Sequence, residues 1–329
     1  MPIDENLASY SDLAFKSAIV VYALVWVMLV WQFAITRKVP TAARELVTVG
    51  GGSDTPPPAA PQLIGKVVDT GRPQRPFSER LGNMAFAVLF VAFASHGLSI
   101  VLRGFATHRF PLGNMFEFIS MATAAAVLLG LVLLRDVRYR GMWAFLLAPV
   151  LILLFLAGTK LHVDAAPVVP ALKSYWLPIH VTVVSIGSGV FLVSGVASVM
   201  FLYRLWQPAG HESDNVFGRV AAMLPDAQTL DRLAYRTTVI GFPIFGTGVI
   251  LGAIWAESAW GRFWGWDPKE TCSFIAWVLY AAYLHARATS GWRDTKAAWI
   301  NIAGFVAMLF NLFIINIVVS GLHSYAGLN

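Results

Sequence analysis

Apolar residues in this chain gather into long, nearly uncharged runs that are separated by shorter polar segments. Eight of these runs approach the ~20 residues that an apolar helix needs to cross a bilayer. They predict spanning helices at approximately 15–36, 82–102, 114–134, 141–158, 177–202, 238–256, 271–286 and 297–319. The expected fold class is therefore an all-α polytopic membrane protein with about eight transmembrane helices.

The composition supports a protein of the lipid bilayer and excludes several metal-site classes. Hydrophobic residues make up 57% of the 329 residues and charged residues 13%, against about 45–50% and about 25% in soluble domains. The single cysteine, Cys272, excludes a disulfide framework, a Cys-rich zinc site and a Cys-ligated iron–sulfur cluster held by this chain alone. Its place one turn into a predicted span indicates a buried, small apolar side chain.

The basic residues predict the orientation in the membrane. With the N-terminus outside, the inside segments hold 17 of the 24 Lys and Arg residues; these segments are 37–80, 135–140, 203–236 and 287–296. Because basic residues concentrate in cytoplasmic loops, both termini are expected outside. The net charge of +6 then follows from topology, and no nucleic-acid partner is needed to explain it.

Three regions are expected along the chain. Residues 1–36 form a retained N-terminal transmembrane anchor, since Asp4 and Glu5 make the start acidic, unlike a signal peptide. Residues 37–80 contain a glycine triplet and a proline triplet and form a flexible inside linker. Residues 81–329 form the main transmembrane domain.

The segment 255–271 is rich in tryptophan and is predicted to lie on the outer side. It holds Trp255, Trp260, Trp264 and Trp266, together with glycines and charged residues. An interfacial aromatic belt is one interpretation, since Trp favours the headgroup level. A flat platform of indole rings that stacks on a large planar ligand such as haem is the favoured one.

Helix capping is enough to explain Asp267 on sequence grounds. The run Asp267-Pro268-Lys269-Glu270 has the form of a capping box, with proline at the first helical position. Asn114 begins a similar run. Because Asn caps a helix about as well as Asp, Asp267→Asn is expected to be nearly silent.

Two of the seven histidines are expected level with the tryptophan segment. His180 opens the fifth predicted span and His323 follows the eighth. Two neutral imidazoles suit six-coordinate haem iron, although a histidine near a helix end often serves only as a satisfied polar group. His285 lies at the inner end of the seventh span. No role is assigned to His96, His108 or His162.

The run from Trp260 to Thr271 resembles the "WWD" signature of haem-handling proteins, in particular the CcsA/ResC subunit family of the system II cytochrome c synthase. The resemblance covers most of residues 80–329 and none of 1–80. Further matching stretches are Arg103–Glu117, Trp176–His180, Leu284–Arg287 and Gly321–Ala326. The sequence around His108 departs from the family's Gly-His-x-Pro-x-Ser-Asn motif.

The resemblance implies a haem-handling transmembrane domain that carries haem b to the outer face. His180 and His323 would be the external axial ligands, and His285 a ligand within the membrane. The four tryptophans and Asp267 would contact the haem. The reaction implied is thioether attachment to a Cys-x-x-Cys-His apocytochrome c, a holocytochrome c synthase (haem lyase) activity of a complex with a ResB/CcsB-type membrane subunit. The bacterial plasma membrane is the expected location, with the thylakoid membrane as the alternative.

Three other interpretations stay open. A haem exporter or chaperone would carry haem without forming bonds. A dihaem electron-transfer protein would need histidine pairs at two depths, and the inner depth shows only His285. A channel or transporter would need broken helices and charges at the midplane, and the predicted spans carry few charges.

Overall fold

The computed structural model describes residues 3–35, 76–136, 139–167, 173–319 and 321–323, and all of its regular elements there are helices. They are α1 (Glu5–Ile35), α2 (Phe77–Thr107), α3 (Met115–Leu133), α4 (Arg140–Thr159), α5 (Trp176–Trp206), α6 (Val216–Ala221), α7 (Ala227–Trp260), α8 (Pro268–Ala288) and α9 (Thr295–Ile317). The all-α fold class is confirmed. Most of the expected linker 37–80 lies outside the described residues, and its last residues already belong to α2.

Seven of these helices are long and apolar enough to cross a membrane: α1, α2, α3, α4, α5, α7 and α9. The remaining long helix, α8, contains the predicted span 271–286 and has 21 residues, which corresponds to about 31 Å of helix. Its composition is less hydrophobic than that of the other seven long helices, because it contains more alanine, tyrosine and charged residues and fewer aliphatic ones. The protein is a multi-pass membrane protein with seven helices of spanning character and an eighth of spanning length among the described residues.

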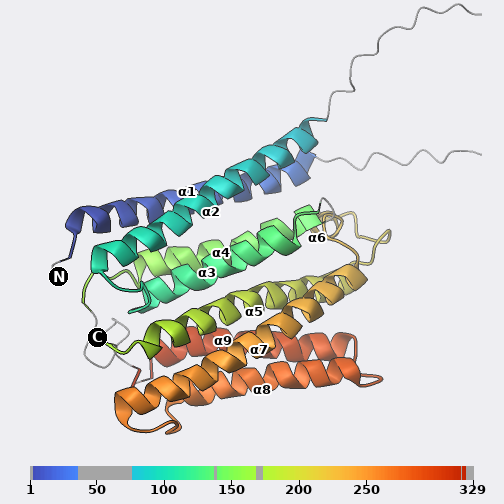
Figure 1. Ribbon diagram of the computed structural model, residues 1–329. Coiled ribbons are helices and arrows are strands. Elements are labelled where there is room, and N and C mark those ends of the chain that lie inside the picture. Colours follow the sequence, from blue (N-terminus) through green and yellow to red (C-terminus); the bar gives the residue numbers. More distant parts are fainter. Residues whose placement is uncertain (1–2, 36–75, 137–138, 168–172, 320, 324–329) are drawn as a thin grey trace, which may run out of the picture.

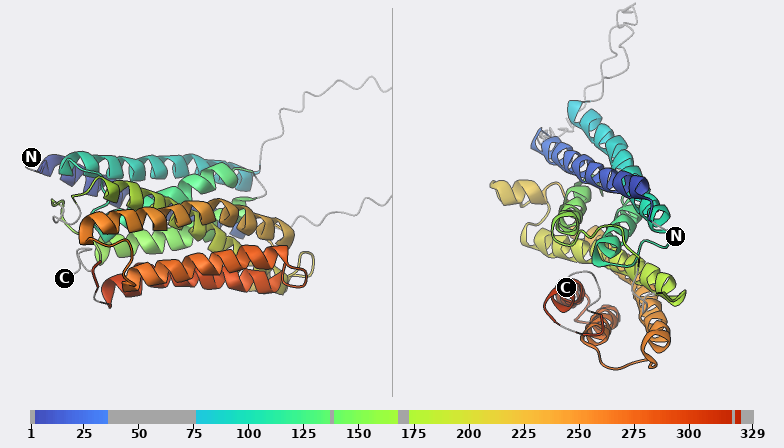
Figure 2. Two further views of the ribbon diagram at one scale, coloured as in Figure 1. Left: turned by 60° about the horizontal axis from the view of Figure 1, so that its bottom comes forward. Right: turned by 90° about the vertical axis from the view of Figure 1, so that its left-hand side faces the viewer.

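The long helices pack as four successive pairs (Figures 1 and 2). The first two helices form one pair, followed by α3 with α4, α5 with α7, and α8 with α9. Helix α5 is central because it contacts α3, α7 and α9, and it is the most buried of the spanning helices. Residues on α5 can therefore meet side chains from both halves of the chain.

Capping residues explain where several of the helices begin and end. The side chains of Asn114 and Asp226 accept hydrogen bonds from backbone N–H groups three residues on, at 2.9 and 2.8 Å. Asp267 forms the predicted capping box at the start of α8. Gly261, with φ of 70°, ends α7 in the left-handed conformation that glycine adopts without strain. The helix starts predicted at Asn114 and Asp267 are confirmed.

The start of α1 and the end of α9 lie at the same end of the bundle as the start of α8 (Figure 1). This agrees with an even number of crossings and with the expectation that the termini share one side. That this side is the outer face stays a prediction from the distribution of basic residues.

Candidate functional site

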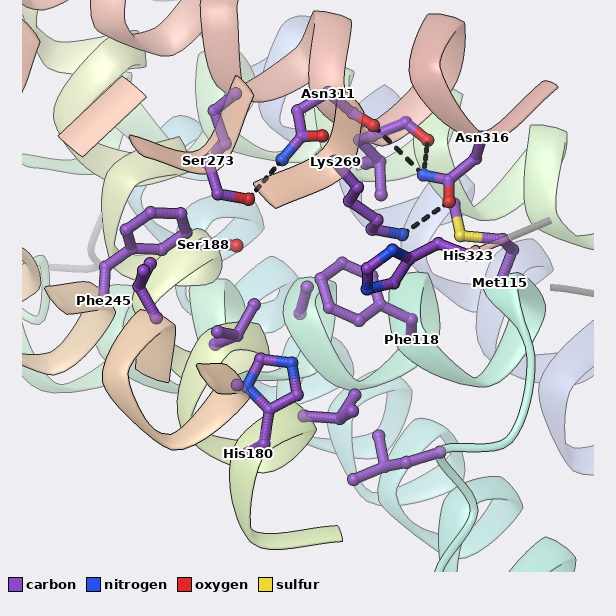
Figure 3. Close-up of a pocket in the computed structure, with 18 of the residues that line it drawn as sticks. Met115, Phe118, His180, Ser188, Phe245, Lys269, Ser273, Asn311, Asn316 and His323 are labelled. Atoms are coloured by element: carbon purple, nitrogen blue, oxygen red, sulfur yellow. Dashed lines mark hydrogen bonds between the residues drawn. The ribbon is translucent and has the colours of Figure 1, made fainter. Parts of the chain in front are cut away.

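A large cavity opens between α3, α5, α7, α8 and α9, near the start of α8 (Figure 3). Its space, counted with its open mouth, is about 1460 Å³. Most of its lining is apolar. The polar lining residues include His180, His323, Lys269, Asn311 and Asn316.

His180 lies near the start of α5, and its ring is fixed against α7. Its Nδ1 lies 2.8 Å from the carbonyl oxygen of Gly248. Since a carbonyl can only accept, Nδ1 carries the proton and Nε2 carries the lone pair. The ring approaches α7 closely because residue 252 is glycine: a Cβ there would lie 2.7 Å from His180 Cε1. The Gly-x-x-x-Gly spacing of residues 248 and 252, a known signal for close helix contact, is the sequence feature that could have predicted this contact.

His323 follows α9 and is held by the first residues of α8. Its Nδ1 lies 2.8 Å from Asp267 Oδ1, while the backbone N–H of Leu322 donates to Asp267 Oδ2 at 2.9 Å. Burial lowers the pKa of His323, and the hydrogen bond to Asp267 only partly opposes this shift. The imidazole is therefore neutral at pH 7, and the carboxylate directs the lone pair to Nε2.

Trp255 brings the two histidines together. Its ring is 1% exposed and stacks on His180, with centroids 6.1 Å apart and planes 6° apart. The centroid of His323 lies 6.0 Å from the same indole and 4.9 Å from Trp260. Residues 180, 255, 260 and 323 thus form one aromatic cluster at the cavity.

The expectation of one flat indole platform is wrong. Trp255 and Trp260 meet at 67°, and Trp264 and Trp266 meet at 89°. Trp264 lines the cavity, whereas Trp266 does not. Trp266 is 68% exposed and lies at a left-handed backbone position, with a φ of 57°. The indole rings therefore face in several directions, because the loop after Gly261 reverses the chain.

Asp267 does more than cap α8, which corrects the sequence-based expectation for its substitution. Burial raises its pKa, but the hydrogen bond from His323 leads the opposing effects, and the pKa falls to about 2. The carboxylate is thus ionised and accepts from both the helix start and the imidazole.

We expect Asp267→Asn to preserve α8 and to weaken a ligand held by His323 about tenfold, since loss of a partner behind a ligating histidine costs roughly 10–100-fold. Titration of the purified protein with haem measures the affinity, and circular dichroism checks the helix content. Asp226→Asn, which alters the exposed N-cap of α7, is the matched control. Equal haem affinity in both variants would show that Asp267 only caps α8 and does not support a ligand held by His323.

A buried ion cluster fixes the loop that forms one rim of the cavity. Glu117, 2% exposed, accepts from Arg109 at 2.8 and 3.0 Å, from Arg103 at 3.2 Å and from the N–H of Gly113 at 2.7 Å. Gly113 and Asn114 line the cavity. The sequence alone does not indicate this role of Glu117, because its cationic partners become neighbours only when the loop folds back.

The other histidines lie away from this cluster. His285 is exposed near the C-terminal end of α8, the end predicted to face inward, and it is absent from the cavity lining. His96 is fully buried between α1, α2 and α3, and its Nε2 lies 3.0 Å from Ser120 Oγ. His108 ends α2 in the left-handed conformation, and His162 lies 3.5 Å from Asp12. Cys272 is buried, as expected.

Comparisons with known proteins agree on one family. A family model described as cytochrome c assembly protein matches residues 81–323. The cytochrome c biogenesis protein CcsA of Mesostigma viride is 31% identical over 264 residues, covering 73% of this chain and 86% of that protein. CcsA of Gloeobacter violaceus is 30% identical, covering 77% and 88%. The solved structure of the cytochrome c heme lyase CcmF shares the fold, with a TM-score of 0.62, 17% identity, and coverage of 95% of this chain and 47% of that chain.

Proposed function

Because this chain belongs to the cytochrome c assembly protein family, we propose that it is the membrane subunit of a cytochrome c synthase. It carries haem b to the outer face and presents it to an apocytochrome c with a Cys-x-x-Cys-His motif. The bacterial plasma membrane is the proposed location. Relatives from algae and cyanobacteria keep the thylakoid membrane as the alternative.

The observation that carries the proposal is the pair of histidines at one cavity. In both rings Nδ1 is tied to an acceptor, Gly248 for His180 and Asp267 for His323. Nε2 is then the atom that can ligate a metal, and each ring is oriented before the ligand arrives. The aromatic cluster around Trp255 offers apolar contact for a porphyrin edge. The donor set therefore fits haem as the transported substrate.

The chemistry requires placement more than acid–base groups. Each cysteine thiol of the apocytochrome adds across one haem vinyl group: the sulfur bonds to the inner vinyl carbon and a proton goes to the terminal carbon. No electrons are lost or gained overall. Holding the two partners in one orientation supplies up to roughly 7–11 kcal/mol in ideal cases. His180 and His323 would hold the haem until the histidine of the substrate replaces one of them.

Haem bound covalently to the apocytochrome distinguishes a synthase from an exporter, which would form no such product. The full chain is expressed with its membrane partner and an apocytochrome in cells that lack their own synthase. Haem that stays on the apocytochrome through denaturing electrophoresis supports the proposal. Haem recovered in the membrane protein, with no covalent product under these conditions, would favour the exporter or chaperone.

A second, inner site is proposed at His285, shared with a ResB/CcsB-type subunit. His285 lies on an exposed face of α8 that also presents Phe274, Ile275 and Val278. A lipid-level imidazole on an open helix face is costly without a partner. A second polypeptide can cover this face and supply the other axial donor.

The expected result is a stable heteromeric complex with more haem per protein than the isolated chain. His285→Ala should remove the additional haem and leave the outer site occupied, because residue 285 lies outside that cavity. Haem is counted by the pyridine haemochrome method on the chain purified with and without its partner. Bis-histidine haem at the inner site of the isolated chain would refute the shared-site proposal.

A further inference from the structure

Lys269 is a cation in an apolar setting at the candidate site. It lies in the first turn of α8, is partly buried and lines the cavity together with both histidines (Figure 3). Among the described lining residues it is the only lysine or arginine. It therefore borders the same space that a ligand of His180 and His323 would fill.

In the described part of the chain, Lys269 has no carboxylate within salt-bridge distance. Its ammonium hydrogen bonds to the side-chain oxygen of Asn316, which is a neutral acceptor. The amide nitrogen of Asn316 donates to two carbonyl oxygens of α9, those of Asn311 and Leu312. Asn316 is thereby oriented with its oxygen toward Lys269, and it positions the ammonium without neutralising it.

The acidic residues nearest to Lys269 in the sequence, Asp267 and Glu270, accept hydrogen bonds from other donors. Asp267 accepts from His323 and from two backbone N–H groups. Glu270 accepts from Arg262 and from the N–H groups of residues 265 and 267. An ammonium has three donors, and the described protein satisfies one of them. An ammonium that is partly buried without a charged partner is costly, and an anion placed beside it offsets that cost.

We propose that Lys269 is the anchor for a carboxylate of the ligand that His180 and His323 hold, and that Asn316 is its positioning residue. This inference rests on the proposed function, because haem is a planar ligand that carries two propionates. The ion pair fixes the rotation of the porphyrin about the axis through the two imidazoles. It thereby selects which vinyl group faces each incoming thiol, a choice that axial ligation alone does not make.

The test compares two porphyrins on the full-length purified chain: iron protoporphyrin IX and its dimethyl ester, in which both carboxylates are blocked. Each is titrated by its Soret band into the wild type, Lys269→Met, Lys269→Arg and Lys173→Met. Lys173 is an exposed lysine in the loop before α5 and serves as the matched control. The wild type and Lys173→Met should bind the free acid at least about tenfold tighter than the ester, the value expected of a charge-assisted hydrogen bond.

Lys269→Met should lose that tenfold preference and bind the ester as the wild type does, while Lys269→Arg should retain most of it. Equal affinity of the wild type for acid and ester would overturn the carboxylate anchor. So would a Lys269→Met variant that weakens acid and ester alike, since that pattern indicates a structural role. Failure of the wild type to give a bis-histidine spectrum with either porphyrin would instead refute the proposed function.

Discussion

His180→Ala and His323→Ala are each expected to abolish covalent cytochrome formation and to remove the low-spin haem spectrum of the outer site. Each substitution deletes one Nε2 donor at the cavity, and the described residues offer no other histidine among its lining. Protein level in the membrane should stay near that of the wild type. The measurements are holocytochrome yield in the co-expression assay and the absorption spectrum of the purified chain.

His211→Ala is the control for these two variants, since His211 lies in the exposed loop between α5 and α6, away from the cavity. It should retain full yield and an unchanged spectrum. Normal holocytochrome yield in either His180→Ala or His323→Ala would remove the basis of the haem-ligand assignment.

Gly252→Ala should lower haem affinity at least about tenfold, although it removes no side chain that would ligate haem. The added methyl carbon would lie 2.7 Å from His180 Cε1 and 3.0 Å from Nδ1, which is too close. The ring cannot simply rotate, because it stacks on Trp255 and hydrogen bonds to Gly248. It must therefore leave its hydrogen bond, and the ligating nitrogen moves with it. Haem titration and holocytochrome yield measure the effect.

Gly97→Ala is the matched control, because a Cβ at residue 97 of α2 meets nothing within 4 Å. Alanine is favoured over glycine inside a helix by about 1 kcal/mol, so both substitutions should leave helix content unchanged or slightly raised. A Gly252→Ala protein that binds haem as tightly as Gly97→Ala would show that the position of His180 does not limit affinity.

The sequence predicted features that depend on local chemistry. Hydrophobic run length located the spanning helices, and the capping motifs at Asn114 and Asp267 located two helix starts. The positions of His180 and His323 at helix ends on one side predicted that they would share a region, and both line one cavity. These results follow from periodicity and from the direction in which each helix runs.

The missed features depend on how distant segments meet. Nothing local to Trp266 signals its left-handed backbone or the absence of its ring from the cavity lining. The bond from His180 to Gly248 requires the packing of α5 on α7, and the bond from His323 to Asp267 spans 56 positions in the sequence. Short-range patterns carry no information on such pairs unless a spacing such as Gly-x-x-x-Gly is used.

The carboxylate of Asp267 accepts from the backbone N–H of Lys269, the backbone N–H of Leu322 and the imidazole of His323 at the same time. The start of α8 and the segment after α9 are thus two halves of one thermodynamic unit. By reciprocity, a ligand that stabilises the imidazole must stabilise the helix start by the same coupling free energy. Amide hydrogen exchange at Lys269 and Leu322 should therefore slow when the site fills, which makes these two backbone positions reporters of occupancy that need no chromophore.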